Sequence, residues 1–234
     1  MRKTLLVLSA ITAVGWAAPA TASLPIPPLP RPDSFVNRID NQWFPLIPGT
    51  VFAYRGEKDG KPGRDVLTVT HRHRTIIGIR ATVVLDRLYL NGHLAERTTD
   101  WYAQDKRGNV WYLGESTATL DAHGKTISTE GTWLAGVHGA RAGIYMPAHP
   151  KPGDTGRQEY YRGHAEDQFK VLSLNARVKS PAVSSRHALL TQETTRLEPG
   201  TLDHKLYVRG IGTVLEQTIK RGSERLALVS VTHR

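Results

Sequence analysis

Short runs in which apolar and polar residues alternate fill the chain from about residue 41 to its C-terminal end. In one run Leu67 and Val69 point to one side of an extended chain, while Val66 and Thr68 point to the other. No stretch keeps an apolar 3.6-residue period over three helical turns. About a dozen such runs, at the roughly 8–12-residue spacing of sandwiches and barrels, predict an all-β fold with at most one or two short helices.

Turn-forming residues divide these runs. Asn91-Gly92 favours a two-residue hairpin, because both central residues of a type I′ turn need positive φ. The run 75–90 that precedes it is predicted to be one continuous strand. Residues 135–156 are rich in Gly and Pro and predict a long loop with at most a short helix.

The N-terminal residues 1–22 have the layout of a secretory signal peptide, with Arg2 and Lys3, an apolar run and an Ala-x-Ala exit that ends at Ala22. The apolar run is shorter than the roughly 20 residues that span a membrane. We therefore predict cleavage near Ala22 and a secreted protein, extracellular or periplasmic, that does not span the membrane. Residues 23–40, with five prolines, predict a stiff tether, and residues 41–234 a single β domain.

Composition narrows the chemistry further. The 234 residues include no cysteine, which excludes disulfides and thiolate sites. The 31 Lys and Arg against 21 Asp and Glu give a net charge of +10, which attracts anionic cell-wall polymers. No nucleic-acid-binding motif accompanies the basic residues, so no nucleic acid partner is expected. The motifs of serine hydrolases, nucleotide enzymes and zinc proteases are missing, and we expect no cofactor.

Several phrases resemble a group of secreted bacterial proteins that is common in actinobacteria. They are N-Q-W-F-P-L-I-P-G-T at 41–50, D-W-Y-A-Q-D at 100–105, G-N-V-W-Y-L-G-E at 108–115, R-Q-E-Y-Y at 157–161 and L-E-P-G at 197–200. The resemblance implies no established activity. A looser likeness, which rests on the stretch from Tyr207 to Val214, is to periplasmic lipoprotein-carrier-like proteins. It implies a strongly curved antiparallel sheet or incomplete barrel with an apolar concave side.

The densest polar and aromatic phrase begins at Asp100. On a strand, Asp100 and Tyr102 face one way and Trp101 and Asp105 the other, and Trp111 follows on the next strand. One interpretation is a ligand platform to which Asp100, Tyr102 and Trp111 contribute. The alternative is that the tryptophans belong to the core and the aspartates cap turns.

A second phrase runs from Glu159 to Asp167. Adjacent Glu166 and Asp167 could reach one cation from a turn. Paired carboxylates could instead perform acid–base catalysis, with Tyr160 or Tyr161 as proton donor. Glu159 and Tyr161 are also candidate ligand-binding residues, and the alternative is a solvated acidic turn. The candidate catalytic residues are Glu159, Tyr160, Tyr161, Glu166, Asp167, Asp100 and Asp105.

His71 and His73 lie two residues apart on one strand face, a spacing that can chelate zinc with a third ligand such as His93 or Glu96. Because arginines surround them, a solvated basic strand is the alternative, and no metal site is expected. Lys205 is a further candidate for ligand binding, and the alternative is that it has a structural role.

Three functions remain open. The first is a secreted envelope protein that binds an apolar small molecule, a lipid or a glycan-like ligand in the concave face of its sheet. The second is an extracellular carboxylate-dependent hydrolase or lyase acting on a polysaccharide or related polymer. The third is a surface protein without a small ligand, held to an anionic wall by charge that salt would screen. Two carboxylates converging in one cleft would favour the enzyme, and an apolar cavity with the acids outside would favour the carrier.

Overall fold

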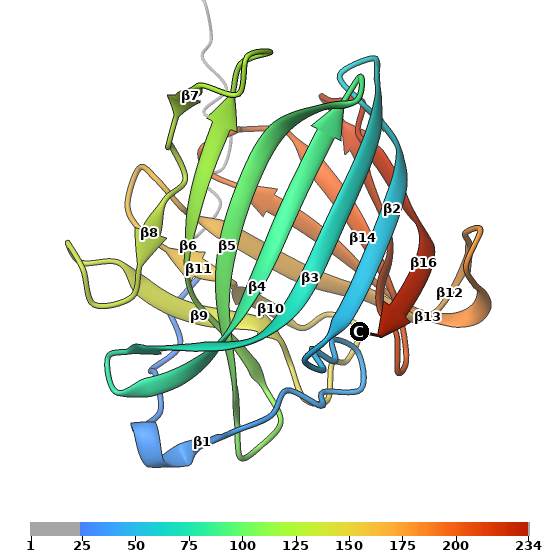
Figure 1. Cartoon of the computed structure of the whole chain (residues 1–234). Coiled ribbons are helices and arrows are strands. Elements are labelled where there is room, and N and C mark those ends of the chain that lie inside the picture. The colour runs from blue at the N-terminus through green and yellow to red at the C-terminus, as the bar shows by residue number, and fades with distance from the viewer. Residues whose placement is uncertain (1–23, 234) are drawn as a thin grey trace, which may run out of the picture.

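The computed structural model describes residues 24–233 and consists almost entirely of β-strands (Figure 1). Within these residues there is no α-helix, and one 3-10 turn (Pro32–Ser34) precedes the first strand. The strands are β1 (Phe35–Val36), β2 (Thr50–Lys58), β3 (Lys61–Ile76), β4 (Ile79–Leu90), β5 (His93–Asp105), β6 (Val110–Leu120), β7 (Thr126–Ser128), β8 (Trp133–Leu134), β9 (Arg141–Met146), β10 (Thr155–Arg157), β11 (Glu159–Tyr160), β12 (Asp167–Lys179), β13 (Ser184–Thr195), β14 (Leu202–Val208), β15 (Gly212–Lys220) and β16 (Arg225–His233). The predicted all-β class is confirmed, and the predicted signal peptide lies outside the described residues.

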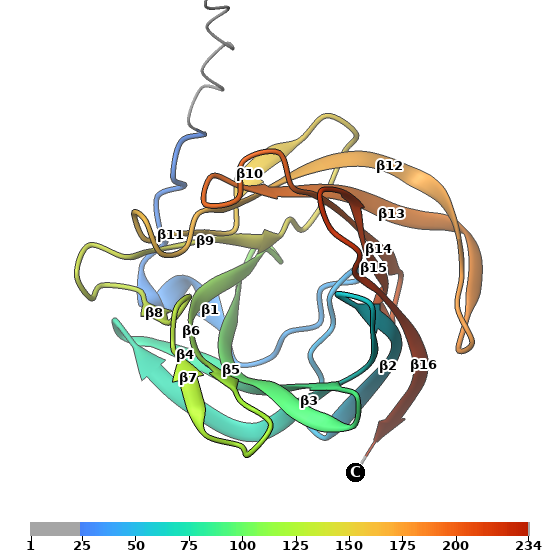
Figure 2. The ribbon, with the colours of Figure 1, turned by 90° about the horizontal axis from the view of Figure 1, so that it is seen from above.

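The strands form one antiparallel sheet in the order β10-β12-β13-β14-β15-β16-β2-β3-β4-β5-β6-β9-β11. Seen from above, this sheet curls round into a barrel (Figure 2). The two ends of the order, β10 and β11, follow each other in the chain with Gln158 between them. One segment therefore pairs first with β12 and then with β9. The barrel is nearly closed, with one seam at this segment, as predicted for a curved sheet or incomplete barrel.

Two short turns at positive φ define the meander from β3 to β5. Asn91 (φ 50°) and Gly92 (φ 82°) form the predicted hairpin between β4 and β5. Ile77 (φ 43°) and Gly78 (φ 81°) form another between β3 and β4, so the prediction of one continuous strand over 75–90 is wrong. The sequence did not predict this turn, because Ile77 is β-branched and such residues rarely adopt positive φ.

The Gly- and Pro-rich segment 135–156 is not one long loop, and that prediction is corrected. It contains β9, which pairs with β6 and β11. At Gly143 a Cβ atom would lie 2.2 Å from the carbonyl oxygen of Arg157. This glycine therefore permits a close approach of two backbones inside the sheet.

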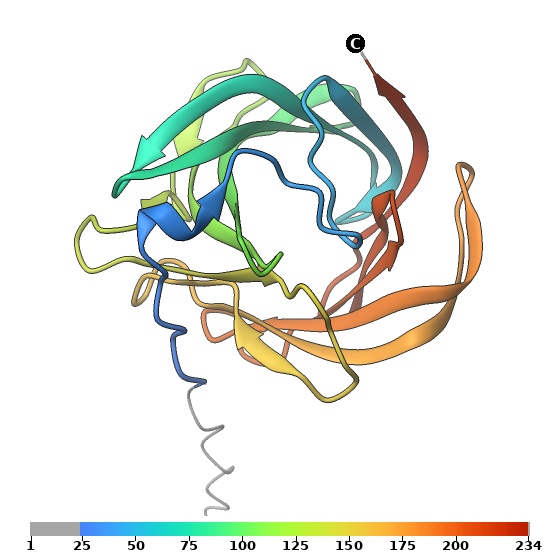
Figure 3. The same cartoon turned by 90° about the horizontal axis from the view of Figure 1, so that it is seen from below.

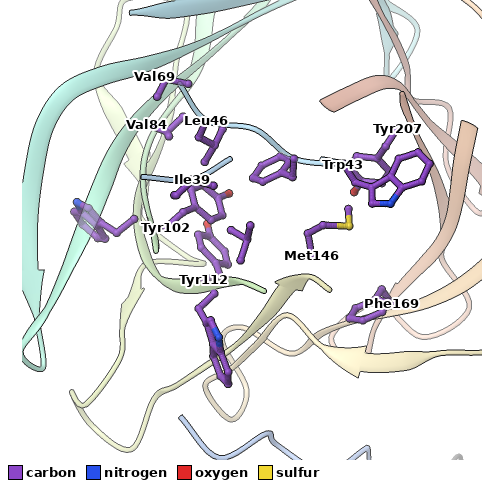
Figure 4. Packing of buried hydrophobic residues seen from close by; sticks show 14 of the residues in the cluster. Ile39, Trp43, Leu46, Val69, Val84, Tyr102, Tyr112, Met146, Phe169 and Tyr207 are labelled. Atoms are coloured by element: carbon purple, nitrogen blue, oxygen red, sulfur yellow. The ribbon is translucent and has the colours of Figure 1, made fainter. Parts of the chain in front are cut away.

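An apolar plug closes one end of the barrel. Residues 35–49, drawn in blue, run across this end (Figure 3). Ile39, Trp43, Phe44 and Leu46 of this segment are each at most 5% exposed and belong to the hydrophobic core. Figure 4 shows Ile39, Trp43 and Leu46 among the other core side chains. β1 pairs with β5, so the last residues of the predicted tether are part of the packed structure.

Candidate functional site

A cavity of about 290 Å³ lies inside the barrel, next to the apolar plug. Strands from most of the circumference contribute inward-facing side chains to it. Nine acids and two lysines line it, together with tyrosines and a few apolar residues. The acids and lysines are Asp65, Asp86, Glu96, Asp100, Glu115, Glu159, Asp167, Glu216, Glu224, Lys58 and Lys205. The cavity lining is thus acidic, although the chain as a whole is basic.

Strand register brings these acids together. Alternate residues of a strand share a face, which places Asp65 of β3 and Asp86 of β4 on the inner wall. Asp100 of β5 pairs directly with Glu115 of β6. Like charges at directly opposite positions destabilise a sheet, so this pair favours a proton or a cation between its carboxyl groups.

A β-bulge in β6 directs both Tyr112 and Glu115 into the cavity. In a regular strand, residues three apart face opposite sides. Here the register between β5 and β6 shifts opposite Trp101, where Gly114 adopts a φ of 144°. A Cβ on Gly114 would stand 2.6 Å from the carbonyl oxygen of Trp133, so glycine is required for this bulge.

Both lysines of the cavity are already paired with carboxylates. Lys58 Nζ lies 2.9 Å from Glu224 Oε2. Lys205 Nζ lies 3.0 Å from Glu193 Oε2 and 3.4 Å from Glu216 Oε1. These charge-assisted contacts commit both ammonium groups to their own acids. Among the described residues, neither lysine forms an ion pair with the other seven acids of the lining.

Seven cavity acids form no ion pair with any residue in the described range, namely Asp65, Asp86, Glu96, Asp100, Glu115, Glu159 and Asp167. The Tyr112 hydroxyl donates a hydrogen bond of 2.5 Å to Asp100 Oδ1. Burial, followed by neighbouring acids, raises the pKa of Asp100 to about 7 and that of Glu115 to about 9. The same causes raise the pKa of Glu159 well above its usual range. Because burial disfavours the charged form, part of this lining holds protons at neutral pH.

Aromatic rings form one wall of the cavity. Tyr102 and Tyr112 stack with 4.7 Å between ring centroids, and Tyr145 meets them edge-on at 5.2 and 5.8 Å. Phe44 of the plug packs against Tyr102 at 5.5 Å. Burial and the nearby Asp100 raise the pKa of Tyr102 and Tyr112, so their hydroxyls remain hydrogen-bond donors.

The structure brings five of the candidate catalytic and ligand-binding residues into this cavity: Asp100, Tyr102, Glu159, Asp167 and Lys205. Asp105 and Trp111 lie elsewhere, which corrects their assignment to the site. Asp105 caps a turn by accepting hydrogen bonds from the backbone N–H groups of Arg107 (2.9 Å) and Asn109 (3.0 Å). The buried indole of Trp111 donates to the same carboxylate at 3.0 Å.

The remaining candidates of the second phrase also lie outside the cavity. Tyr160 lies under the guanidinium of Arg157, and Tyr161 stacks on His164. Glu166 accepts a hydrogen bond of 2.9 Å from the backbone N–H of Gly163. It therefore holds its own turn together, and the proposed pairing of Glu166 with Asp167 on one cation is not seen.

The histidine pair likewise forms no metal site. His71 is exposed on β3, and His73 Nδ1 lies 2.9 Å from Arg80 Nη2. Burial and Arg80 lower the pKa of His73. Glu96, the suggested third ligand, lines the interior instead. The described residues contain no group of three His, Cys, Asp or Glu side chains arranged to hold a metal ion.

Most of the cavity acids escaped the sequence analysis. Two of them, Asp65 and Asp86, are single acids on strand faces whose neighbouring inward residues are apolar, as Asp86 is between Val84 and Leu88. An isolated acid on an apolar strand face was therefore the available signal. The missed titratable residues are Tyr54, Lys58, Asp65, Asp86, Tyr112, Glu115, Tyr145, Glu216 and Glu224.

No family model matches the chain, and no curated protein does. A Bacteroides fragilis structure, provisionally described as an exported protein with a YmcC-like fold, is 15% identical with a TM-score of 0.47 over 82% of this chain and 99% of its own. A Parabacteroides distasonis structure, provisionally described as a lipoprotein, is 9% identical with a TM-score of 0.41 over 82% and 100%. Similarity at this level assigns no function to this chain. Within residues 24–233 there is no helix with the length and apolar character to cross a membrane.

Proposed function

We propose that this protein is a secreted binding protein of the cell envelope that holds one small, glycan-like ligand inside its barrel. The observation that carries the proposal is the interior cavity of about 290 Å³, lined by nine acids and four tyrosines. Its volume is near the lower end of the roughly 300–1,000 Å³ range of small-molecule sites. The signal-peptide pattern of residues 1–22 supports export.

The lining favours a polyhydroxylated ligand over an apolar one. Carboxylates accept hydrogen bonds from hydroxyl groups, whereas protonated carboxyls and tyrosine hydroxyls donate them. Tyrosine rings also offer apolar faces to the C–H groups of a sugar. An apolar ligand or a lipid tail would displace water from acids such as Asp100 and Glu115 without replacing its hydrogen bonds. Each group left without a partner costs roughly 1–3 kcal/mol.

A carboxylate-dependent hydrolase is the second candidate. It is favoured by the convergence of Asp100, Glu115, Glu159 and Asp167 on one cavity. A pKa of about 7, which burial gives Asp100, suits a general acid. Binding is the better-supported function, because a polymer would have to insert an end into the barrel and could not lie across an open cleft. The third candidate function is retention on an anionic cell wall by charge alone. It is less well supported, because it does not account for the acidic cavity.

Native mass spectrometry of the mature protein, purified from its own secretion route, tests the binding function. We expect a polar molecule to co-purify and to be displaced in Leu67→Trp, because Leu67 lines the cavity. Val66→Trp is the matched control, since the neighbouring residue lies on the other strand face. A molecule that stays bound in both variants, or an apolar one, would contradict the proposal.

Incubation with polysaccharides separates the two candidate functions. Release of sugar products by the native protein, abolished in Asp100→Asn and kept in the surface variant Glu130→Gln, would establish the hydrolase. Binding of small glycan fragments without product release supports the binding protein.

A further inference from the structure

The cavity already holds ammonium groups of the protein itself. Lys58 is bound by Glu224, and Lys205 by Glu193 and Glu216. The Lys205 ammonium also lies 6.0 Å from the ring centroid of Tyr145. Carboxylates together with an aromatic face are the surroundings in which proteins recognise alkylammonium ligands. The interior chemistry therefore suits an organic cation.

A further acidic group in the cavity lacks such an ammonium. Asp100, Glu115, Glu159 and Asp167 converge from β5, β6, β11 and β12, and none forms an ion pair with a residue that the structure describes. Glu159 is only 5% exposed, and its Oε2 atom completes no hydrogen bond among residues 24–233. The indole N–H of Trp133 and the backbone N–H of Asp167 lie near this carboxyl and partly offset the rise in its pKa that burial causes. The stacked ring of Tyr112 lies beside this group, because its hydroxyl is bonded to Asp100.

An unpartnered carboxylate oxygen inside a protein is unfavourable by roughly 1–3 kcal/mol or more, and an incoming N–H donor would remove that penalty. An ammonium group carries three donors and a positive charge. One of its donors can bond Glu159 Oε2, while its charge offsets that of the neighbouring Asp167 and Glu115. The direct opposition of Asp100 and Glu115 would then become favourable, since a cation between two carboxylates replaces their repulsion by attraction.

We propose that Asp100, Glu115, Glu159 and Asp167 bind a protonated amine, so that the ligand is an organic cation such as an amino sugar or a short diamine. The inference rests on the proposed function, because it takes the same cavity as the binding site, and it adds the charge of the ligand. The four acids come from four different strands. Among the described residues no three such side chains are arranged to hold a metal ion, so the group suits an ammonium on a carbon skeleton better than a metal ion.

Two matched pairs of probes test the inference by calorimetric titration of the mature protein. Glucosamine is compared with glucose, and 1,6-diaminohexane with 1,6-hexanediol, so that an amine replaces a hydroxyl at similar size. We expect each amine to bind at least about tenfold more tightly than its hydroxyl analogue, which corresponds to about 1.4 kcal/mol. Glu159→Gln should remove most of this preference, because an amide cannot ionise to the carboxylate that would pair with the amine. The exposed Glu130→Gln is the matched control and should retain the preference.

The possible outcomes separate the inference from the proposed function. Equal affinities for amines and hydroxyl analogues, with binding abolished in Leu67→Trp, would overturn the inference and leave the proposed function in place. Failure of both amines to bind would also overturn the inference, while native mass spectrometry still decides the proposed function. Thermal unfolding first establishes that Glu159→Gln is folded. Asp167→Asn, whose carboxylate is open to the cavity, serves as the second variant.

Discussion

The inner and outer faces of the barrel wall carry opposite charges. Nine of the 21 Asp and Glu residues line the interior cavity, together with only two lysines. On the outer face, arginines lie over aromatic rings. Arg64 covers Tyr89 and Arg74 covers Trp101, each with 4.3 Å between the guanidinium carbon and the ring centroid. The division follows the pleat of single strands, as in β3, where outward Arg64 directly precedes inward Asp65.

The two faces hold charge under different physical conditions. An outer guanidinium keeps most of its hydration while its stem and plane cover apolar surface. An inner carboxyl loses hydration, which raises the pKa of Asp100 to about 7 and that of Glu115 to about 9. Carboxyls buried without cationic partners lower the stability of the fold that holds them. This difference between the two faces favours the interior as the functional face, because acids with shifted pKa values are concentrated at binding and catalytic sites.

Loss of Lys205 should have the largest effect on stability. In Lys205→Met, Glu193 and Glu216 lose their shared ammonium, and breaking a buried ion pair of this kind costs roughly 3–5 kcal/mol. Urea unfolding at neutral pH measures the free energy of unfolding. Lys170→Met, at an exposed position of β12, is the matched control and should change it by less than about 0.5 kcal/mol.

The deficit of Lys205→Met should shrink in acid. Burial raises the pKa of Glu216 to about 7 even with Lys205 present, so its carboxyl readily takes up a proton once the lysine is gone. A deficit of the same size at pH 5 and pH 8 would argue that Lys205 acts by packing and not by charge.

The interior acids also predict a protein that loses stability as pH rises. Burial raises the pKa of Asp100 from 3.8 to about 7 and that of Glu115 from 4.5 to about 9. Between the unfolded and folded pKa values the folded state binds more protons, so the free energy of unfolding decreases with increasing pH. We expect the midpoint of thermal unfolding to fall steadily from pH 5 to pH 9, where these carboxyls must ionise inside the barrel.

Asp100→Asn isolates one of these groups. The amide oxygen can still accept the hydrogen bond from Tyr112, but no charge has to be buried. At pH 9 we expect the free energy of unfolding to rise by about 2–4 kcal/mol, since one pKa unit corresponds to about 1.4 kcal/mol. At pH 3 we expect little gain, because Asp100 is then protonated in both the folded and the unfolded protein. Asp33→Asn, at an exposed position, should change stability at neither pH.

The sequence predicts the strands well and the site only in part. Alternating residues and the Asn91-Gly92 turn act over a few residues, so they identify the all-β class and a hairpin. Asp100 and Glu159 attract notice because polar and aromatic residues crowd around them. Asp65 and Asp86 do not, because each is a single acid in its own run, and only the register between β3 and β4 brings the two together.

Local exceptions account for the other failures. The bulge at Gly114 reverses the facing of Glu115, and alternation alone places that acid on the wrong side. Asp105 shares a phrase with Asp100 but caps a turn, because its side chain finds backbone N–H groups two and four residues ahead. Short polar side chains commonly bond their own turn, so composition alone cannot separate these two aspartates.

The outer face should give the smallest effects. Arg72 and Arg74 both project from the exposed, basic part of β3, but Arg74 lies over the Trp101 ring, whereas Arg72 contacts no ring that the structure describes. Arg74→Gln should lower the free energy of unfolding by about 0.5–1 kcal/mol, and Arg72→Gln by less than about 0.5 kcal/mol. On a polyanionic column both variants should elute at similarly reduced salt, because long-range attraction depends on net charge and not on ring contacts. A loss of stability in Arg72→Gln, or an elution shift in only one variant, would contradict this prediction. It would show that the outer charges, like the inner ones, act through specific contacts and not only through net charge.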